Sequence, residues 1–312
     1  MIADPMKNLF CILLLLQMGA LFGEGSEKPV ISVYLPDYRV KAGDLKPRLY
    51  GTTHLVLFSA KPTEEGAVDF CRITPELLAF GRKARDTGDV KVTFCVGGWG
   101  SGNAFAGAVS TAENRNRFVD SLVEFCEAKH LDGIDINWEF PKGDQEHADF
   151  ALFLEALSGK LRSVNCILTV ALGESRPLPE KCWPFIDQVN LMSYQPWWSK
   201  TDYDTYLSDS IELFLKSGLP PEKLILGVGL FAKEKEGERR AVSWKKLVGE
   251  NAVSLPESEH GFWPVGPKAC DLRLKLIKEH DLGGVMVWDY GHDSFEPEHS
   301  LLRHLSAGLA DW

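Results

Sequence analysis

The chain of 312 residues contains 45% hydrophobic and 25% charged residues and has a formal net charge of −10 at pH 7. This composition is ordinary for a globular protein, and the length is sufficient for one large domain or two modest ones. No run of lysine or arginine forms a stripe that could neutralise phosphates, so nucleic acid and anionic membranes are poor partners. A neutral substrate would be indifferent to the negative charge.

The first residues resemble an export signal. A positive charge precedes the apolar run at residues 9–16, which has the length of a signal peptide's hydrophobic region and is too short to span a bilayer. We therefore expect a signal peptide at residues 1–25 and a mature chain at residues 26–312, without a membrane segment and secreted to the extracellular space or a periplasm. An uncleaved N-terminal anchor is the alternative.

Six of the seven cysteines follow the expected signal peptide. An even number in an exported protein permits disulfides, but a domain of this size does not need them. Cys95 and Cys166 lie in apolar strand-like runs, where they could equally be small buried side chains. Because no Cys-x-x-Cys pair or histidine cluster suggests zinc, we expect no metal. No glycine-rich phosphate loop follows the candidate strands at residues 223–229 and 283–288, so we expect no cofactor either.

Short apolar runs alternate with helical patterns along the mature chain. The strand candidates are residues 30–35, 53–58, 90–96, 131–141, 166–172, 188–194, 223–229 and 283–288. The helix candidates are residues 74–85, a helix begun by the capping-box pattern of Ser110 and Glu113, and residues 146–164, 207–216 and 269–280. Continuous apolar strands separated by helices indicate a parallel sheet covered on both faces, and eight such units predict a closed α/β fold, the (β/α)8 barrel.

Residues 131–141 carry polar side chains at alternate positions of an apolar run. In a strand, Asp135, Asn137 and Glu139 share one face because successive side chains alternate sides. Burying two carboxylates and an amide on one face is costly unless they are paired or put to use. A barrel also places its active site where strands end, and other strand ends carry Trp99, Tyr194 and similar residues. We therefore expect a functional site at this mouth.

Four segments together resemble a known family. Residues 132–141, Asp-Gly-Ile-Asp-Ile-Asn-Trp-Glu-Phe-Pro, resemble the D-G-x-D-x-D-x-E signature of family 18 glycoside hydrolases, the chitinases and chitinase-like lectins. Residues 96–99, 192–195 and 283–288 resemble the family's third, sixth and eighth strands, in the correct order. The resemblance spans the chain from about residue 30 to residue 288.

The resemblance implies a retaining mechanism in which the substrate assists its own cleavage. Glu139 matches the acid that protonates the leaving oxygen, Asp135 the inner aspartate that tunes its neighbour, and Tyr194 the phenol that binds the attacking acetamido oxygen. The substrate-binding positions are Trp99, Met192, Gln195 and Trp288. Each aromatic residue among them could instead be a packing residue.

Two positions depart from the family pattern. Asn137 stands where the family has a third aspartate, which stabilises the positive intermediate, and Gln195 replaces a second carboxylate. Loss of one preorganised electrostatic contact commonly costs ~3 kcal/mol, or about a hundredfold in rate. Activity is therefore expected to be reduced without being abolished.

Many members of the family insert a small α+β domain between the seventh and eighth strands. Only about fifty residues separate Leu230 from Gly283, and one helix with its loops fills most of them. We expect a single barrel without that insertion domain and with an open cleft.

These observations predict a secreted, monomeric hydrolase of β-1,4-linked N-acetylglucosamine polymers, chitin or chitooligosaccharides. A weak or inactive chitin- or glycan-binding lectin on the same barrel is one alternative. An endo-β-N-acetylglucosaminidase acting on N-glycans is another, because it shares the chemistry and differs only in its subsites.

Overall fold

The computed structural model describes residues 28–40, 47–194, 202–234, 241–249, 262–263 and 265–310. Within these ranges eight parallel strands pair in a closed ring, in which the last strand returns to the first. In ring order they are β1 (Val30–Pro36), β2 (His54–Pro62), β4 (Lys91–Gly97), β5 (Gly133–Asn137), β6 (Ile167–Gly173), β7 (Gln188–Met192), β8 (Leu224–Gly229) and β12 (Gly284–Trp288). The predicted (β/α)8 barrel is confirmed.

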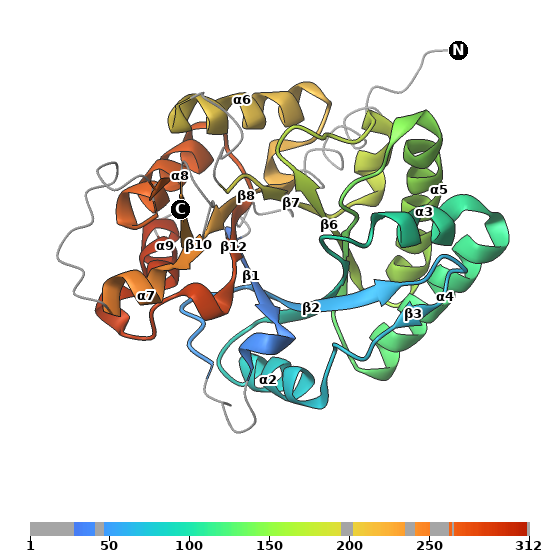
Figure 1. Ribbon diagram of the computed structural model, residues 1–312, viewed down its shortest axis with the longest axis horizontal. Coiled ribbons are helices and arrows are strands. Elements are labelled where there is room, and N and C mark those ends of the chain that lie inside the picture. Colours follow the sequence, from blue (N-terminus) through green and yellow to red (C-terminus); the bar gives the residue numbers. More distant parts are fainter. Residues whose placement is uncertain are drawn as a thin grey trace, which may run out of the picture.

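Helices surround this ring on its outer side (Figure 1). They are α2 (Pro75–Arg85), α3 (Gly102–Ser110), α4 (Ala112–Ala128), α5 (Gly143–Ser163), α6 (Tyr203–Lys216), α8 (Pro267–Glu279) and α9 (Leu301–Leu309). The larger hydrophobic core lies between strands and helices, and a smaller one that includes Tyr34, Val56 and Met286 fills part of the barrel. None of the helices in the described ranges has the length and apolar character needed to cross a membrane.

Capping residues were predicted for two helices, and the two predictions had different outcomes. Thr74 caps α2 by accepting a hydrogen bond from the Leu77 amide at 3.2 Å, as expected. The capping-box prediction was wrong by one residue, because Thr111 caps α4. Ser110 instead ends α3, a helix that was not predicted, and its hydroxyl donates to the Gly107 carbonyl of that helix.

The connection between β8 and β12 contains more than the single predicted helix. Three short strands, β9 (Phe231–Glu234), β10 (Ala241–Ser243) and β11 (Phe262–Trp263), form a small antiparallel sheet beside the short helix α7 (Trp244–Gly249). Strands of two to four residues are too short to show an alternating pattern in a sequence.

A buried arginine joins the outer helices to the mouth of the barrel. The Arg273 side chain on α8 is 0% exposed, and its guanidinium donates to the carbonyl oxygens of Gly227 at 2.6 Å, Ser193 at 2.9 Å and Tyr194 at 3.0 Å. These carbonyls lie on β8 and just after β7. The cation therefore fixes the backbone that carries Tyr194.

Replacing Arg273 should destabilise the fold. Arg273→Met removes the donors and leaves the Ser193 carbonyl without its partner, whereas the Gly227 carbonyl still accepts from the Ser193 hydroxyl and the Tyr194 carbonyl from the Tyr203 hydroxyl. One unpaired buried carbonyl costs roughly 1–3 kcal/mol, so urea unfolding should show a loss of about that size. Lys275→Met on the exposed side of the same helix is the control, with a change within ~0.5 kcal/mol. Equal losses in the two variants would contradict this role for Arg273.

Candidate active site

Hydrogen bonds at both ends fix the position of strand β5. Asp132, just before the strand, accepts hydrogen bonds from the Val92 amide at 2.6 Å and from Arg85 at 2.5 Å, on the outer side of the barrel. At the other end the Gly98 amide donates to the Asn137 carbonyl at 2.8 Å. A Cβ atom on Gly97 would lie 2.2 Å from that carbonyl oxygen, so glycine is required for this close approach.

Asp135 lies inside the barrel in a network of hydrogen bonds. Its carboxylate accepts from the hydroxyls of Tyr34 at 2.8 Å and Thr169 at 2.6 Å and from the Asn190 amide at 3.1 Å. Asn190 also donates to the Tyr34 hydroxyl at 3.0 Å and accepts from Gln188 at 2.7 Å. Burial raises the pKa of Asp135, and these donors oppose that rise.

Asn137 and Glu139 follow toward the mouth of the barrel. Asn137 is 4% exposed, and its Oδ1 has no hydrogen-bond partner in the described part of the chain. Glu139 is half-buried; burial raises the pKa of its carboxyl, and hydrogen bonding to the Asn137 side chain partly opposes the rise. A carboxyl with a raised pKa retains its proton to higher pH than an exposed glutamate, as a general acid must.

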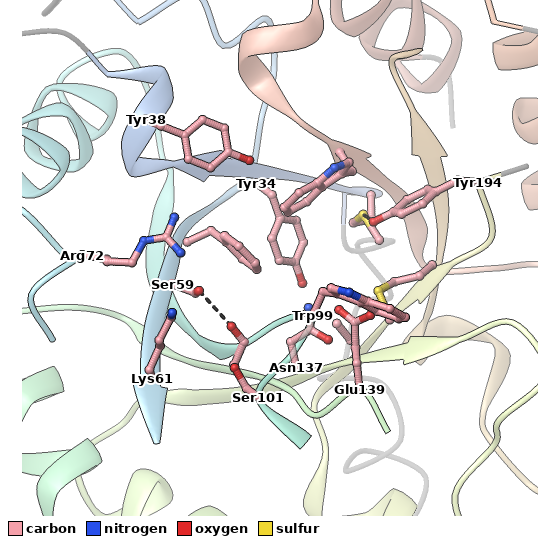
Figure 2. A pocket seen from close by; sticks show the side chains of 16 residues that line it. Tyr34, Tyr38, Ser59, Lys61, Arg72, Trp99, Ser101, Asn137, Glu139 and Tyr194 are labelled. Carbon is pink, nitrogen blue, oxygen red and sulfur yellow. Dashed lines mark hydrogen bonds between the residues drawn. The ribbon is translucent and has the colours of Figure 1, made fainter. Parts of the chain in front are cut away.

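Aromatic rings form one wall of a cavity of about 360 Å³ that opens at Glu139 (Figure 2). The Trp288 ring lies 4.9 Å from Phe58 and 5.8 Å from Tyr34, between ring centroids. The Tyr194 hydroxyl is near Met286, and burial followed by the charge of Glu139 raises the pKa of the Tyr194 phenol, which keeps it a neutral donor. Trp99 is 86% exposed at the rim.

A second cavity, of about 500 Å³, adjoins the first. Both cavities share Trp99, Glu139, Met192 and Tyr194 as lining residues. The second adds side chains from the ends of β5 and β6, namely Phe140, Glu174, Ser175 and Arg176. Glu139 therefore lines both cavities, which meet at these four residues.

The structure gathers nearly all predicted site residues at this cleft. Asp135, Asn137, Glu139, Tyr194, Trp99, Met192 and Trp288 lie at or directly below it. Gln195 and the predicted signal peptide lie outside the described residues. Several participants were not predicted from the sequence: Tyr34, Phe58, Ser59, Lys61, Arg72, Ser101, Thr169 and Asn190. For all of them except Arg72, which lies in the segment before α2, the available signal was a position on a barrel strand or just after its end.

The site consists of a half-buried acid that lines two cavities with aromatic walls, at the mouth of a (β/α)8 barrel. This arrangement is typical of a protein that acts on or binds carbohydrate. The sequence model of the family described as Glycosyl hydrolases family 18 matches residues 30–263. The chain belongs to this family, which includes chitinases and chitinase-like proteins.

Similar proteins include both enzymes and binding proteins. A chitinase-like effector of Moniliophthora roreri is 29% identical over 279 residues, covering 76% of this chain and 66% of its own length. The chain thus spans slightly less than two thirds of that relative. The fold matches a chitinase from Bacteroides thetaiotaomicron, with a TM-score of 0.80, 18% identity, and 91% and 97% of the two chains covered. It also matches the chitinase-like agglutinin of Robinia pseudoacacia, with a TM-score of 0.75, 20% identity, and 89% and 99% covered.

The pKa of Glu139 should respond to its amide neighbour. In Asn137→Leu, which keeps the volume and burial but removes the amide, the pKa of Glu139 should rise further, because the remaining effect is burial. NMR titration of carboxyl carbons measures it, with Glu139→Gln identifying the signal. A pKa that falls or stays constant in Asn137→Leu would show that the amide does not stabilise the carboxylate.

Proposed function

We propose that this protein hydrolyses β-1,4 linkages between N-acetylglucosamine units of chitin or chitooligosaccharides, with retention of configuration. The observation that carries the proposal is the position of Glu139, a carboxyl with a raised pKa at the junction of two cavities. A polymer bound along the cleft would place one linkage beside this acid. Family membership supports this reading.

In the proposed reaction the substrate supplies its own nucleophile. The acetamido oxygen attacks the anomeric carbon while the glycosidic C–O bond breaks and the Glu139 proton passes to the leaving oxygen. The resulting oxazolinium ring then takes up water, whose proton returns to the Glu139 carboxylate. Tyr194 donates to the acetamido oxygen, and Trp288 supports the sugar ring.

The amide of Asn137 limits the rate of the proposed reaction. Its unpaired Oδ1 can accept a hydrogen bond from the acetamido N–H and so orient the nucleophile. As a neutral amide it cannot offset the positive charge of the oxazolinium. Asp135, which lies deeper on the same strand, has oxygens already bonded to Tyr34, Thr169 and Asn190. We therefore propose a slow enzyme.

Two other functions fit the same cleft. The missing charge at Asn137 favours a glycan-binding protein with little or no turnover, in line with relatives described as a chitinase-like effector and a chitinase-like agglutinin. An endo-β-N-acetylglucosaminidase acting on N-glycans would use the same acid. The proposed setting remains secretion after removal of residues 1–25, with residues 26–312 as one monomeric barrel domain.

Glu139→Gln should greatly slow turnover of chitotetraose. A glutamine cannot deliver the proton, so the rate should fall by about 10²–10⁴-fold, while calorimetry shows that the oligosaccharide still binds. A high-mannose glycoprotein digested in parallel separates chitin from N-glycan substrates. If the unaltered protein binds tightly but turns over neither substrate, the proposal of an enzyme is wrong and the protein is a lectin.

Asn137→Asp is the complementary variant. A carboxylate beside the oxazolinium should raise the rate on chitotetraose by about tenfold to a hundredfold, the reverse of losing one preorganised contact. Asn116→Asp on the exposed side of α4 adds the same charge away from the cleft and should change nothing. An unchanged rate in Asn137→Asp would mean that this site does not work by the family's mechanism.

A further inference from the structure

One arm of the first cavity differs in character from its aromatic wall. It is lined by Ser59 and Lys61 from β2, Arg72 from the segment before α2 and Ser101 from the start of α3, on the side of the cavity away from Tyr194 (Figure 2). We refer to these four residues as the polar arm. They bring two cations and two hydroxyls to one side of the cleft, in a protein whose net charge is −10.

The Lys61 ammonium is available to a ligand. Within the described ranges it forms no ion pair of its own, although Asp69 stands opposite it in the β2–β3 ladder, where β3 is Val68–Asp69. The pKa of Asp69 is lowered chiefly by hydrogen bonds from Cys71, and Lys61 contributes only the smallest effect. The cation and that carboxylate are therefore weakly coupled.

Arg72 retains donors after its own ion pair is satisfied. Its Nε and one Nη bond to the two oxygens of Asp37 at 3.1 and 2.5 Å. A guanidinium has five N–H donors, so three remain after this bidentate contact. Asp37 offsets the charge and fixes the plane of the group, which leaves a preorganised donor edge at the cavity.

Ser101 supplies a buried hydroxyl that has no hydrogen-bond partner among the residues that the structure describes. The residue is 8% exposed and occupies the position before α3, yet its side chain makes no capping hydrogen bond to that helix. A serine at this position normally accepts from a helix amide. Ser59 differs, because its hydroxyl donates to the Gly97 carbonyl at 2.9 Å and can only accept further bonds. Ser101 is thus the hydroxyl of the arm that remains free to donate.

We propose that the polar arm binds an acidic substituent, a carboxylate or a sulfate, on a sugar lying beside Glu139. Lys61 supplies the charge, Arg72 a directional pair of donors and Ser101 a hydroxyl donor, which is the donor set that such oxyanions prefer. The substrate class would then be an N-acetylated glycan that carries acidic groups. This inference rests on the proposed function only for the position of the sugar chain in the cleft.

Binding to a catalytically disabled protein tests the proposal independently of turnover. In the Glu139→Gln background, calorimetry compares a carboxymethylated chitin tetramer with a hydroxyethylated one, which has similar bulk and no charge. The carboxymethylated ligand should bind about tenfold more tightly at ~50 mM salt, and the advantage should shrink at ~500 mM salt as charges are screened. A sulfated tetramer tested alongside distinguishes sulfate from carboxylate as the preferred group.

Charge-matched variants locate the effect. Adding Lys61→Gln should reduce the tenfold preference for the carboxymethylated tetramer to about twofold or less. Lys278→Gln, on the exposed side of α8, removes the same charge and should leave the preference intact. Ser101→Ala should lower it by a smaller factor. Equal affinities for the charged and neutral tetramers, or a preference that survives Lys61→Gln, would overturn the proposal. Loss of all binding, to both tetramers, in the Glu139→Gln background would instead count against the proposed function.

Discussion

The structure depends on one buried carboxylate, that of Asp135 at the centre of the barrel. An ionised side chain in an apolar interior is costly unless donors surround it. Those donors come from three other strands: Tyr34 on β1, Thr169 on β6 and Asn190 on β7. Because each can reach Asp135 in only one register, the network also fixes how these strands stand relative to β5.

The register of β5 then determines which side chains face the active site. Alternation places Asp135, Asn137 and Glu139 at successive heights on one side, while Trp138 points outward. Trp138 is 1% exposed and packs against Phe105 and Phe150, with ring centroids 5.4 and 5.1 Å apart. A shift of one residue would bury a carboxylate among these rings. The hydrophobic packing outside the barrel therefore holds the acid in place inside it.

What the sequence could predict follows from the same alternation. Polar residues at every second position of an apolar strand, as in β5, are visible without a structure. The barrel follows from a different pattern, eight apolar strands that alternate with helices. Tyr34 was missed because a tyrosine in an apolar strand resembles packing. Arg273 was missed because an arginine on an amphipathic helix is ordinarily solvent-exposed, and its carbonyl partners belong to distant strands. Lys61 and Arg72 meet only through folding.

The environment of Glu139 supports the proposed reaction more directly than the amide of Asn137 opposes it. A site that only binds sugar needs a hydrogen-bonding group, which a neutral amide would provide without desolvation of a charge. Glu139 instead carries a raised pKa because it is half-buried, so folding destabilises its charged form. That cost brings no advantage to binding, but it keeps a proton on the group for transfer. In the proposed reaction, Asn137 would limit the rate of such a transfer and not its possibility, because the proton donor and the two cavities that it lines are all present.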